Sequence, residues 1–201
     1  MVERLEIARS ELILGGQKSG KSRRAELLAR DWLAASNTHH AVLIATAQPW
    51  DEEMRARITR HQSDRAERVP GLRTVEEPRH LGEAIAQYSR PDTLLVVDCL
   101  TLWLTNWLMP MEPAPQENLE LNRPLAGVSI DYSAILLGSL IRAPGPVVLV
   151  GNEIGLGVIP MGAQVRAFVD ALGCLNQEVA RVCQRVTLMV AGLPMALKDA
   201  P

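Results

Sequence analysis

The sequence predicts an α/β fold in which a mostly parallel β-sheet is flanked by helices. Two observations predict it. Short runs of aliphatic residues alternate with amphipathic stretches along most of the 201-residue chain, and this alternation is typical of parallel βαβ units with helices on both faces of the sheet. A glycine-rich segment also joins the first run to the first amphipathic stretch, as expected of a strand–loop–helix unit that binds phosphate.

The strands are expected where the chain is richest in Leu, Val and Ile. In order they are residues 11–14, 41–46, 72–75, 93–98, 146–150 and 185–190.

The helices are expected where apolar residues recur at helical spacing, as Ala25, Leu28 and Trp32 do in the first of them. In order they are residues 21–35, 51–66, 79–89, 131–142 and 162–183.

Segment 110–127 is rich in proline and polar residues, and it predicts a surface loop or an insertion. The rest of the chain shows no linker and no internal repeat. Residues 1–201 are therefore expected to form a single domain, which suits the chain's length.

Residues 15–22, "GGQKSGKS", follow the first strand and match the pattern G-x-x-x-x-G-K-[ST]. Glycines let the backbone curl so that its N–H groups converge on an anion, and the helix that follows directs its positive end at the same point. Lys21 would reach the β- and γ-phosphates, and Ser22 would offer its hydroxyl to Mg²⁺. A glycine-rich turn with a chance lysine is the alternative, but the strand–loop–helix context favours a nucleoside triphosphate site.

Ligands of such sheets bind at the carboxyl ends of the strands. Asp98 ends one apolar run, and its carboxylate predicts a second Mg²⁺ anchor. The alternative is that Asp98 caps a helix that begins at Leu100. Glu153, in the glycine-rich segment 151–160, could orient a hydroxyl or a metal-bound water, or lie in a simple strand-to-helix turn.

The predicted helix 51–66 places Arg57, His61 and Arg65 at intervals of four residues, and therefore on one face. Such a face could bind a polyphosphate while a neutral imidazole attacks phosphorus. The alternative is a solvated, arginine-rich helix with a bystander histidine. Spacing alone favours the bystander.

Composition limits the class of protein. A formal net charge of −2 leaves no broad basic surface for nucleic acid. The longest apolar run, 94–109, is too short to span a membrane and contains polar residues, and the charged N-terminus does not resemble a signal peptide. A cytoplasmic protein is therefore expected, with Cys99, Cys174 and Cys183 as small buried hydrophobic residues.

Several segments together resemble one enzyme family. They occur in the order "GGQKSGKSRRAE", "LIATAQPWDEEMRARITRH", "RTVEEPRHL", "VVDCLTLWLTN", "GNEIGLGVIP", "RAFVDALGCLNQEVA" and "VAGLP". They closely resemble the bifunctional adenosylcobinamide kinase / adenosylcobinamide-phosphate guanylyltransferases of cobalamin biosynthesis. The likeness covers nearly the whole chain apart from 110–127. The glycine-rich loop is shared with many NTPases, whereas the histidine and NEIGLG segments are far more specific.

The resemblance implies a RecA-like P-loop NTPase fold and two reactions. In the first, a nucleoside triphosphate phosphorylates the aminopropanol hydroxyl of adenosylcobinamide. In the second, a histidine attacks the α-phosphate of GTP, releases pyrophosphate and holds GMP as a phosphoramidate. The GMP then passes to adenosylcobinamide phosphate and gives adenosylcobinamide-GDP.

The resemblance also implies which residues act, and it reverses the interpretation of His61 that spacing alone favours. His61 matches the family's guanylylated histidine, and Mg²⁺ is expected on Ser22 and Asp98. The nucleotide substrates are expected to be GTP, ATP or both. The matching nucleotide-binding positions are Gly15, Gly16, Gln17, Lys18, Ser19, Gly20, Lys21, Ser22, Ala45, Thr46, Ala47, Gln62, Ser63, Asp64, Arg65, Glu76 and Asp98.

The expected partners are a corrinoid substrate and nucleotides, without nucleic acid. The family suggests a homo-oligomer, and a trimer is one form that fits. The apolar stretch 100–109 could supply part of that interface, or it could be a buried core helix.

The chain departs from the family pattern after the histidine. Ala66 follows Arg65 where the family has proline, and Leu72 stands where the family has tryptophan. His61 also lies farther than usual from "RTVEE", and Ala47 replaces a frequent serine. These departures bear on the contacts that residues 62–65 make with the nucleotide.

Two other functions fit the phosphate loop alone. One is a kinase for another small alcohol, with His61 idle. The other is a nucleotide-dependent switch or a RecA-like DNA motor, which the lack of a basic surface argues against.

Overall fold

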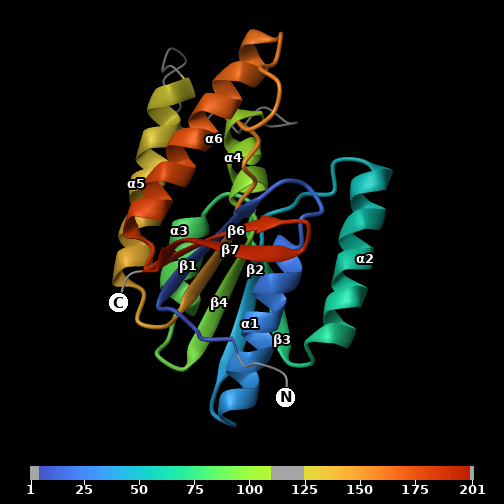
Figure 1. Ribbon diagram of the computed structural model, residues 1–201, viewed down its shortest axis with the longest axis vertical. Coiled ribbons are helices and arrows are strands. Elements are labelled where there is room, and N and C mark those ends of the chain that lie inside the picture. The colour runs from blue at the N-terminus through green and yellow to red at the C-terminus, as the bar shows by residue number, and fades with distance from the viewer. Residues whose placement is uncertain (1–4, 110–124, 200–201) are drawn as a thin grey trace.

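The computed structural model describes residues 5–109 and 125–199, and its centre is a seven-stranded sheet (Figure 1). The strand order is β3-β2-β4-β5-β1-β6-β7, and only β7 runs antiparallel, beside β6. The strands are β1 (Ser10–Gly15), β2 (His40–Ala45), β3 (Leu72–Glu76), β4 (Thr93–Asp98), β5 (Val147–Val150), β6 (Arg185–Val190) and β7 (Leu193–Asp199). The predicted α/β class with a mostly parallel sheet is confirmed.

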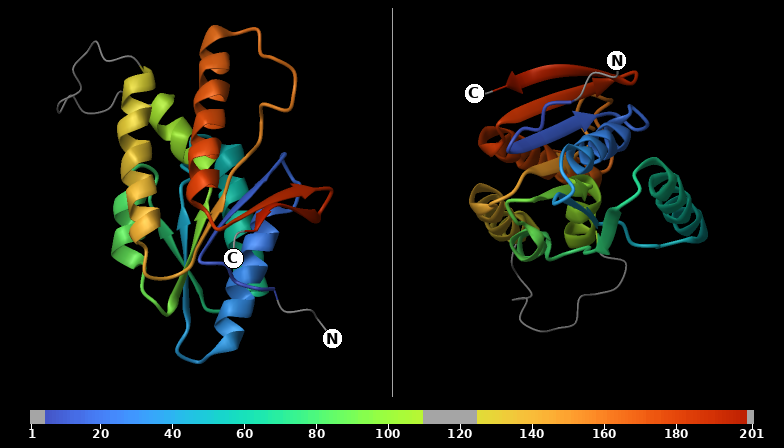
Figure 2. Two further views of the ribbon diagram at one scale, coloured as in Figure 1. Left: turned by 60° about the vertical axis from the view of Figure 1, so that its left-hand side comes forward. Right: turned by 90° about the horizontal axis from the view of Figure 1, so that it is seen from below.

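The helices cover both faces of the sheet (Figure 2). They are α1 (Lys21–Ala35), α2 (Glu52–Arg68), α3 (Leu81–Tyr88), α4 (Leu100–Leu108), α5 (Leu125–Arg142) and α6 (Ala163–Val182). None of the helices in the described part of the chain is long and apolar enough to cross a membrane.

Two apolar cores follow from the alternation of side chains along the strands. In β1, Leu12 and Leu14 face the core shared with α3, α4, α5 and α6, whereas Ile13 faces the core shared with α1. Strand β4 alternates in the same way. Both faces of these strands are therefore buried, which explains their continuous aliphatic sequences.

Each predicted strand is present, with bounds that agree to within one residue. Helix α5 begins earlier than predicted, at Leu125, so the last three residues of the predicted loop 110–127 are helical. The remainder of that loop, 110–124, lies outside the described residues.

Helix α4 was predicted only as one of two alternatives, and strand β7 was not predicted. One of the three cysteines that were predicted to be buried is exposed. Helix α4 was one of two alternatives for the apolar stretch 100–109, and the structure shows it as a core helix with Trp103 fully buried. Strand β7, "LPMALKD", was missed because Pro194 near its start weakens the strand signal, although its large apolar residues do alternate. Proline is tolerated there because the strand lies at the sheet's edge. Cys99 and Cys183 are buried as predicted, but Cys174 is exposed.

Candidate active site

The phosphate loop joins β1 to α1 in a conformation that its glycines make possible. Gly15 and Gly20 have φ values of +148° and +102°. A Cβ at Gly15 would lie 2.5 Å from the carbonyl oxygen of Met189 and 2.7 Å from Ser19 Oγ. The loop therefore closes tightly on strand β6, and a side chain at Gly15 would open it.

Lys21 lies over the loop. It is the first residue of α1, is 8% exposed, and donates from Nζ to the carbonyl oxygen of Gly16 at 2.6 Å. Burial lowers the pKa of Lys21, while Cys99 and Asp98 nearby raise it. Lys21 is thus a partly desolvated cation at the mouth of a backbone loop, where a phosphate would gain most from it.

The N-terminus of α1 suits an anion. Its capping residue is Gly20, and among the described residues no side chain caps it and no acidic residue occupies its first turn. Uncapped N–H groups and the positive end of the helix dipole are together a binding site for phosphate. Ser19 Oγ is buried and has no hydrogen-bond partner in the part of the chain that the structure describes, so it is available to a ligand.

The β6–β7 turn supports this loop, and sequence reasoning missed it because β7 was not predicted. Gly192 N donates to the carbonyl oxygen of Ser19 at 3.0 Å, and a Cβ at Gly20 would lie 3.4 Å from Gly192 Cα. The C-terminal hairpin therefore fixes the far side of the phosphate loop.

Three predicted residues lie at one level of the sheet's carboxyl edge. Ala45 pairs with Glu76 on one side and with Asp98 on the other. Helix α4 is capped by Cys99 rather than by Asp98, and no capping bond from a side chain is present there among the described residues. The structure therefore contradicts the alternative in which Asp98 is a helix cap.

Ser22 and Asp98 fit a magnesium ion. Their donors are a hydroxyl and a carboxylate oxygen, the type that Mg²⁺ prefers, and the charge of Asp98 acts on Lys21, the neighbour of Ser22. Among the described residues, no group of three or more His, Cys, Asp or Glu side chains is placed to hold a metal ion.

Thr46 holds the end of β4 in place. Its hydroxyl donates to the carbonyl oxygen of Cys99 at 2.7 Å and accepts from Cys99 N at 2.9 Å, while its own N donates to the carbonyl oxygen of Asp98 at 3.1 Å. Thr46 is fully buried. The backbone N of Thr46 therefore holds Asp98, and its side chain holds Cys99. Ala45 and Ala47 can offer a nucleotide only backbone groups and methyl surface.

Glu153 lies beside the phosphate loop, since its N donates to the carbonyl oxygen of Gly15 at 3.2 Å. Asn176 of α6, which is buried, donates to Glu153 Oε2 at 3.3 Å and to the carbonyl oxygen of Asn152 at 3.0 Å. The segment after β5 is thus more than a simple turn, because a buried amide orients its carboxylate. Sequence reasoning missed Asn176, although a polar residue on an otherwise apolar helix face is a signal that could have found it.

Helix α2 carries His61, and its side chains are arranged differently from the prediction. Asp51 caps the helix by accepting from Met54 N at 2.6 Å. His61 is exposed, whereas Arg65 is buried, with Nε 3.6 Å from Glu26 Oε1 of α1. The side chain of Arg57 lies outside the described residues. In this structure Arg65 therefore pairs with a carboxylate of α1, and the polyphosphate-binding face of Arg57, His61 and Arg65 stays a prediction.

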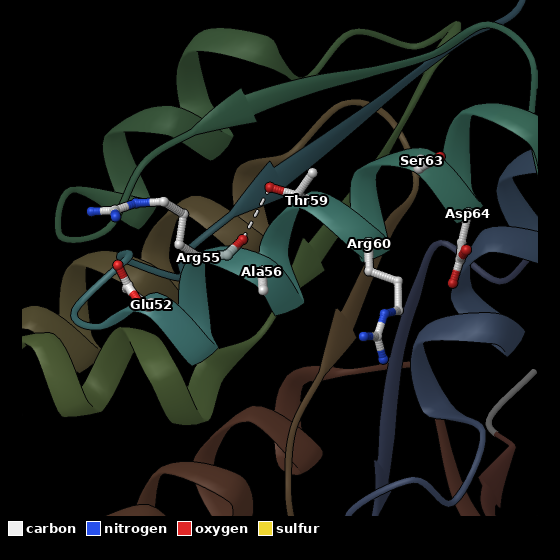
Figure 3. A pocket seen from close by; sticks show the side chains of 7 residues that line it. All are labelled: Glu52, Arg55, Ala56, Thr59, Arg60, Ser63 and Asp64. Carbon is white, nitrogen blue, oxygen red and sulfur yellow. Dashed lines mark hydrogen bonds between the residues drawn. The ribbon is translucent and has the colours of Figure 1, made fainter.

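Residues 62–65 do not share a direction. Successive helical residues are turned by about 100°, so four of them are spread over about 300° around the helix axis and cannot all face one ligand. Ser63 and Asp64 line a shallow groove on α2 together with Glu52, Arg55, Ala56, Thr59 and Arg60 (Figure 3). Helical geometry places most of this groove opposite the buried Arg65, on the outer face of α2.

The comparisons with known proteins show which family the chain resembles. The family model described as cobinamide kinase / cobinamide phosphate guanyltransferase matches residues 11–197. The chain is 45% identical over 192 residues to the bifunctional adenosylcobalamin biosynthesis protein CobP of Pseudomonas aeruginosa, covering 95% of this chain and 98% of that protein. It is 35% identical over 191 residues to the corresponding protein CobU of Salmonella typhimurium, covering 93% and 98%.

Solved structures resemble the chain in fold alone. The flagellar accessory protein FlaH of Methanocaldococcus jannaschii matches with a TM-score of 0.50 and 12% identity, over 96% of this chain and 80% of that one. A solved ATPase domain matches with a TM-score of 0.50 and 12% identity, over 90% of this chain and 69% of that one. Both likenesses support the P-loop NTPase fold.

The family match extends across the phosphate loop, the His61 helix and the NEIGLG segment together, and it overturns both alternative functions that fit the phosphate loop alone. The chain belongs to the family of bifunctional cobinamide kinases and cobinamide phosphate guanylyltransferases.

Proposed function

We propose that a single nucleotide site, the phosphate loop of residues 15–22, serves both reactions of the family, and that His61 accepts GMP in the second. The observation that carries the proposal is the position of Lys21, whose ammonium lies over the loop and within electrostatic reach of Asp98. In the described residues, this is the place where a backbone loop, an uncapped helix N-terminus and a buried cation come together.

In the kinase reaction, the loop N–H groups and Lys21 bind the β- and γ-phosphates and stabilise the charge on their oxygens. The hydroxyl of adenosylcobinamide attacks the γ-phosphorus and loses its proton to water. The bond between the γ-phosphorus and the oxygen that bridges to the β-phosphorus breaks, and the nucleoside diphosphate leaves. Ser22 and Asp98 would hold Mg²⁺, which neutralises phosphate charge when bound.

In the guanylyltransferase reaction, a ring nitrogen of neutral His61 attacks the α-phosphorus of GTP. The bond to the β-phosphate oxygen breaks, pyrophosphate leaves, and GMP stays on the ring as a phosphoramidate. A phosphate oxygen of adenosylcobinamide phosphate then attacks the same phosphorus and frees His61. The covalent intermediate divides one transfer between two large substrates into two displacements.

Inhibition by an ATP analogue with a β,γ-methylene bridge tests whether the site is shared. One shared site predicts that the analogue competes with the nucleotide in both reactions and has the same inhibition constant in each. Competition in the kinase reaction alone would contradict a shared site.

We further infer a cytoplasmic homo-oligomer. Its support in the structure is a group of aliphatic side chains between β5 and α6 that are 78–95% exposed: Leu156, Val158, Ile159 and Met161. The predicted contribution of stretch 100–109 is not supported, because helix α4 is largely buried. Sedimentation of the purified chain would measure the assembly directly.

A further inference from the structure

Helix α2 is attached to the rest of the molecule at its C-terminal end. Of its described side chains, only Arg65 is buried, and Val69, which follows the helix, is 1% exposed and packs in the core shared with α1. His61 and most of the residues before it are exposed. Figure 1 shows α2 beside α1 at the margin of the molecule. The last turns of α2 therefore hold the whole helix.

The attachment depends on one carboxylate, that of Glu26. Glu26 lies on α1 and is 2% exposed. It forms an ion pair with Arg68 of α2 and lies 3.6 Å from Arg65 Nε. Arg65 also donates from Nη1 to Thr74 Oγ1 of β3 at 3.3 Å. A carboxylate buried so deeply needs its cations, and removing the charge would leave Arg65 unpaired.

Helix α1 links this pair to the phosphate loop. Glu26 is one turn after Ser22, so one helix carries Lys21 at its start and the attachment of α2 a turn later. On α2, His61 is one turn before Arg65. The position of His61 relative to the phosphate loop therefore depends on the contact between Arg65 and Glu26 and on the turn of α1 between Glu26 and the loop.

We propose that Glu26 is a positioning residue for guanylyl transfer: through Arg65 and Arg68 it sets the position of the helix that carries His61. The proposal rests on the proposed role of His61. The kinase reaction uses the loop and Lys21, which precede Glu26 on α1, and is independent of α2. Loss of the Glu26 charge should therefore separate the two activities.

The test compares Glu26→Gln with Asp31→Asn, a matched control. Asp31 is also a buried carboxylate of α1, 8% exposed, but it pairs with Arg30 and accepts from Leu5 N, away from α2. Because a misplacement of about 1 Å can cost on the order of 100-fold, Glu26→Gln should slow single-turnover guanylylation at least ~10-fold. Its kinase rate should stay within about twofold of wild type, and Asp31→Asn should change the ratio of the two rates little.

Arg68 provides a second variant, since it belongs to the pair but not to the proposed nucleotide site. Arg68→Ala should slow guanylylation while sparing the kinase, and Arg68→Lys should restore much of it because it keeps the charge. Equal loss of both activities in Glu26→Gln would overturn the proposal, and so would guanylylation at the wild-type rate.

Hydrogen exchange of residues 54–66 measures how firmly α2 is attached, and it does so whether or not His61 is the nucleophile. Glu26→Gln should speed exchange in α2, and Asp31→Asn should not. If wild-type protein carries no GMP on His61, the proposed function fails while the exchange result still decides whether Glu26 holds α2. Unchanged exchange would refute the attachment itself.

Discussion

The phosphate loop and helix α2 are held in opposite ways. The loop is enclosed by β1, α1 and the β6–β7 turn, and bonds from Lys21 and Gly192 fix it at both ends. Helix α2 is exposed along most of its length and is tied to the body by Arg65, Arg68 and Val69 at one end. The comparison teaches that the groups proposed to bind phosphate are preorganised, whereas the position of the proposed nucleophile depends on how one helix is attached.

The largest expected effect comes from removing the cation of the enclosed loop. Lys21→Ala should lower the kinase rate by on the order of 100-fold or more, because a preorganised donor to the transferred phosphate is lost. Enzyme assays and calorimetric titration with GTP measure this. Lys198→Ala, which removes a lysine from the edge strand, is the control and should stay near wild type. Normal GTP affinity in Lys21→Ala would mean that the loop is not the nucleotide site.

Asp98→Asn comes next, since it keeps size but removes the charge at the end of β4. The Mg²⁺ concentration needed for half-maximal activity should rise on the order of 10-fold. Folding should survive, because Thr46 holds the adjacent backbone through bonds that the substitution leaves intact. An unchanged Mg²⁺ requirement would remove Asp98 from the metal site.

Thr46→Val tests the rigidity of the enclosed region. The substitution removes a hydroxyl that bonds both N and O of residue 99, and it should lower the free energy of unfolding by about 1–3 kcal/mol. Denaturant unfolding measures the loss. Thr38→Val, at an exposed threonine, should stay within about 0.5 kcal/mol of wild type. Equal stability of both variants would show that Thr46 does not brace β4.

The smallest effect is expected on the outer face of α2. Ser63→Ala should change guanylylation less than about twofold, because exposed substitutions away from a site are usually neutral and Ser63 lines the groove on that face. Single-turnover rates measure this. A loss of tenfold or more would mean that α2 turns this face toward the nucleotide.

Local patterns carried the prediction of the fold and of the phosphate loop. The aliphatic runs that form β1 and β4 are buried on both faces of the sheet. In the loop between β1 and α1, the glycines of the motif adopt the positive φ values that the loop needs. Strand β7 was missed although its large apolar residues alternate, because Pro194 near its start and the charged residues at its end weaken the strand signal.

The site was less predictable where distant segments meet. Helical spacing correctly aligned Arg65 with His61 on α2, but it carries no information about Glu26, which lies 39 residues earlier than Arg65 in the sequence. Spacing therefore could not predict the buried ion pair that Arg65 makes. Asn176 and the β6–β7 turn escaped for the same reason, because their contacts with Glu153 and Ser19 are tertiary.

Covalent labelling of His61 tests the central claim most directly. Incubation with GTP labelled at the α-phosphate should leave label on the chain that is labile in acid and stable in base, as expected of a phosphoramidate. His61→Ala should lose that label and still phosphorylate adenosylcobinamide, because Lys21, Ser22 and Asp98 are untouched. Label that persists in His61→Ala, or a wild-type chain that acts as a kinase and never takes up label, would contradict the account.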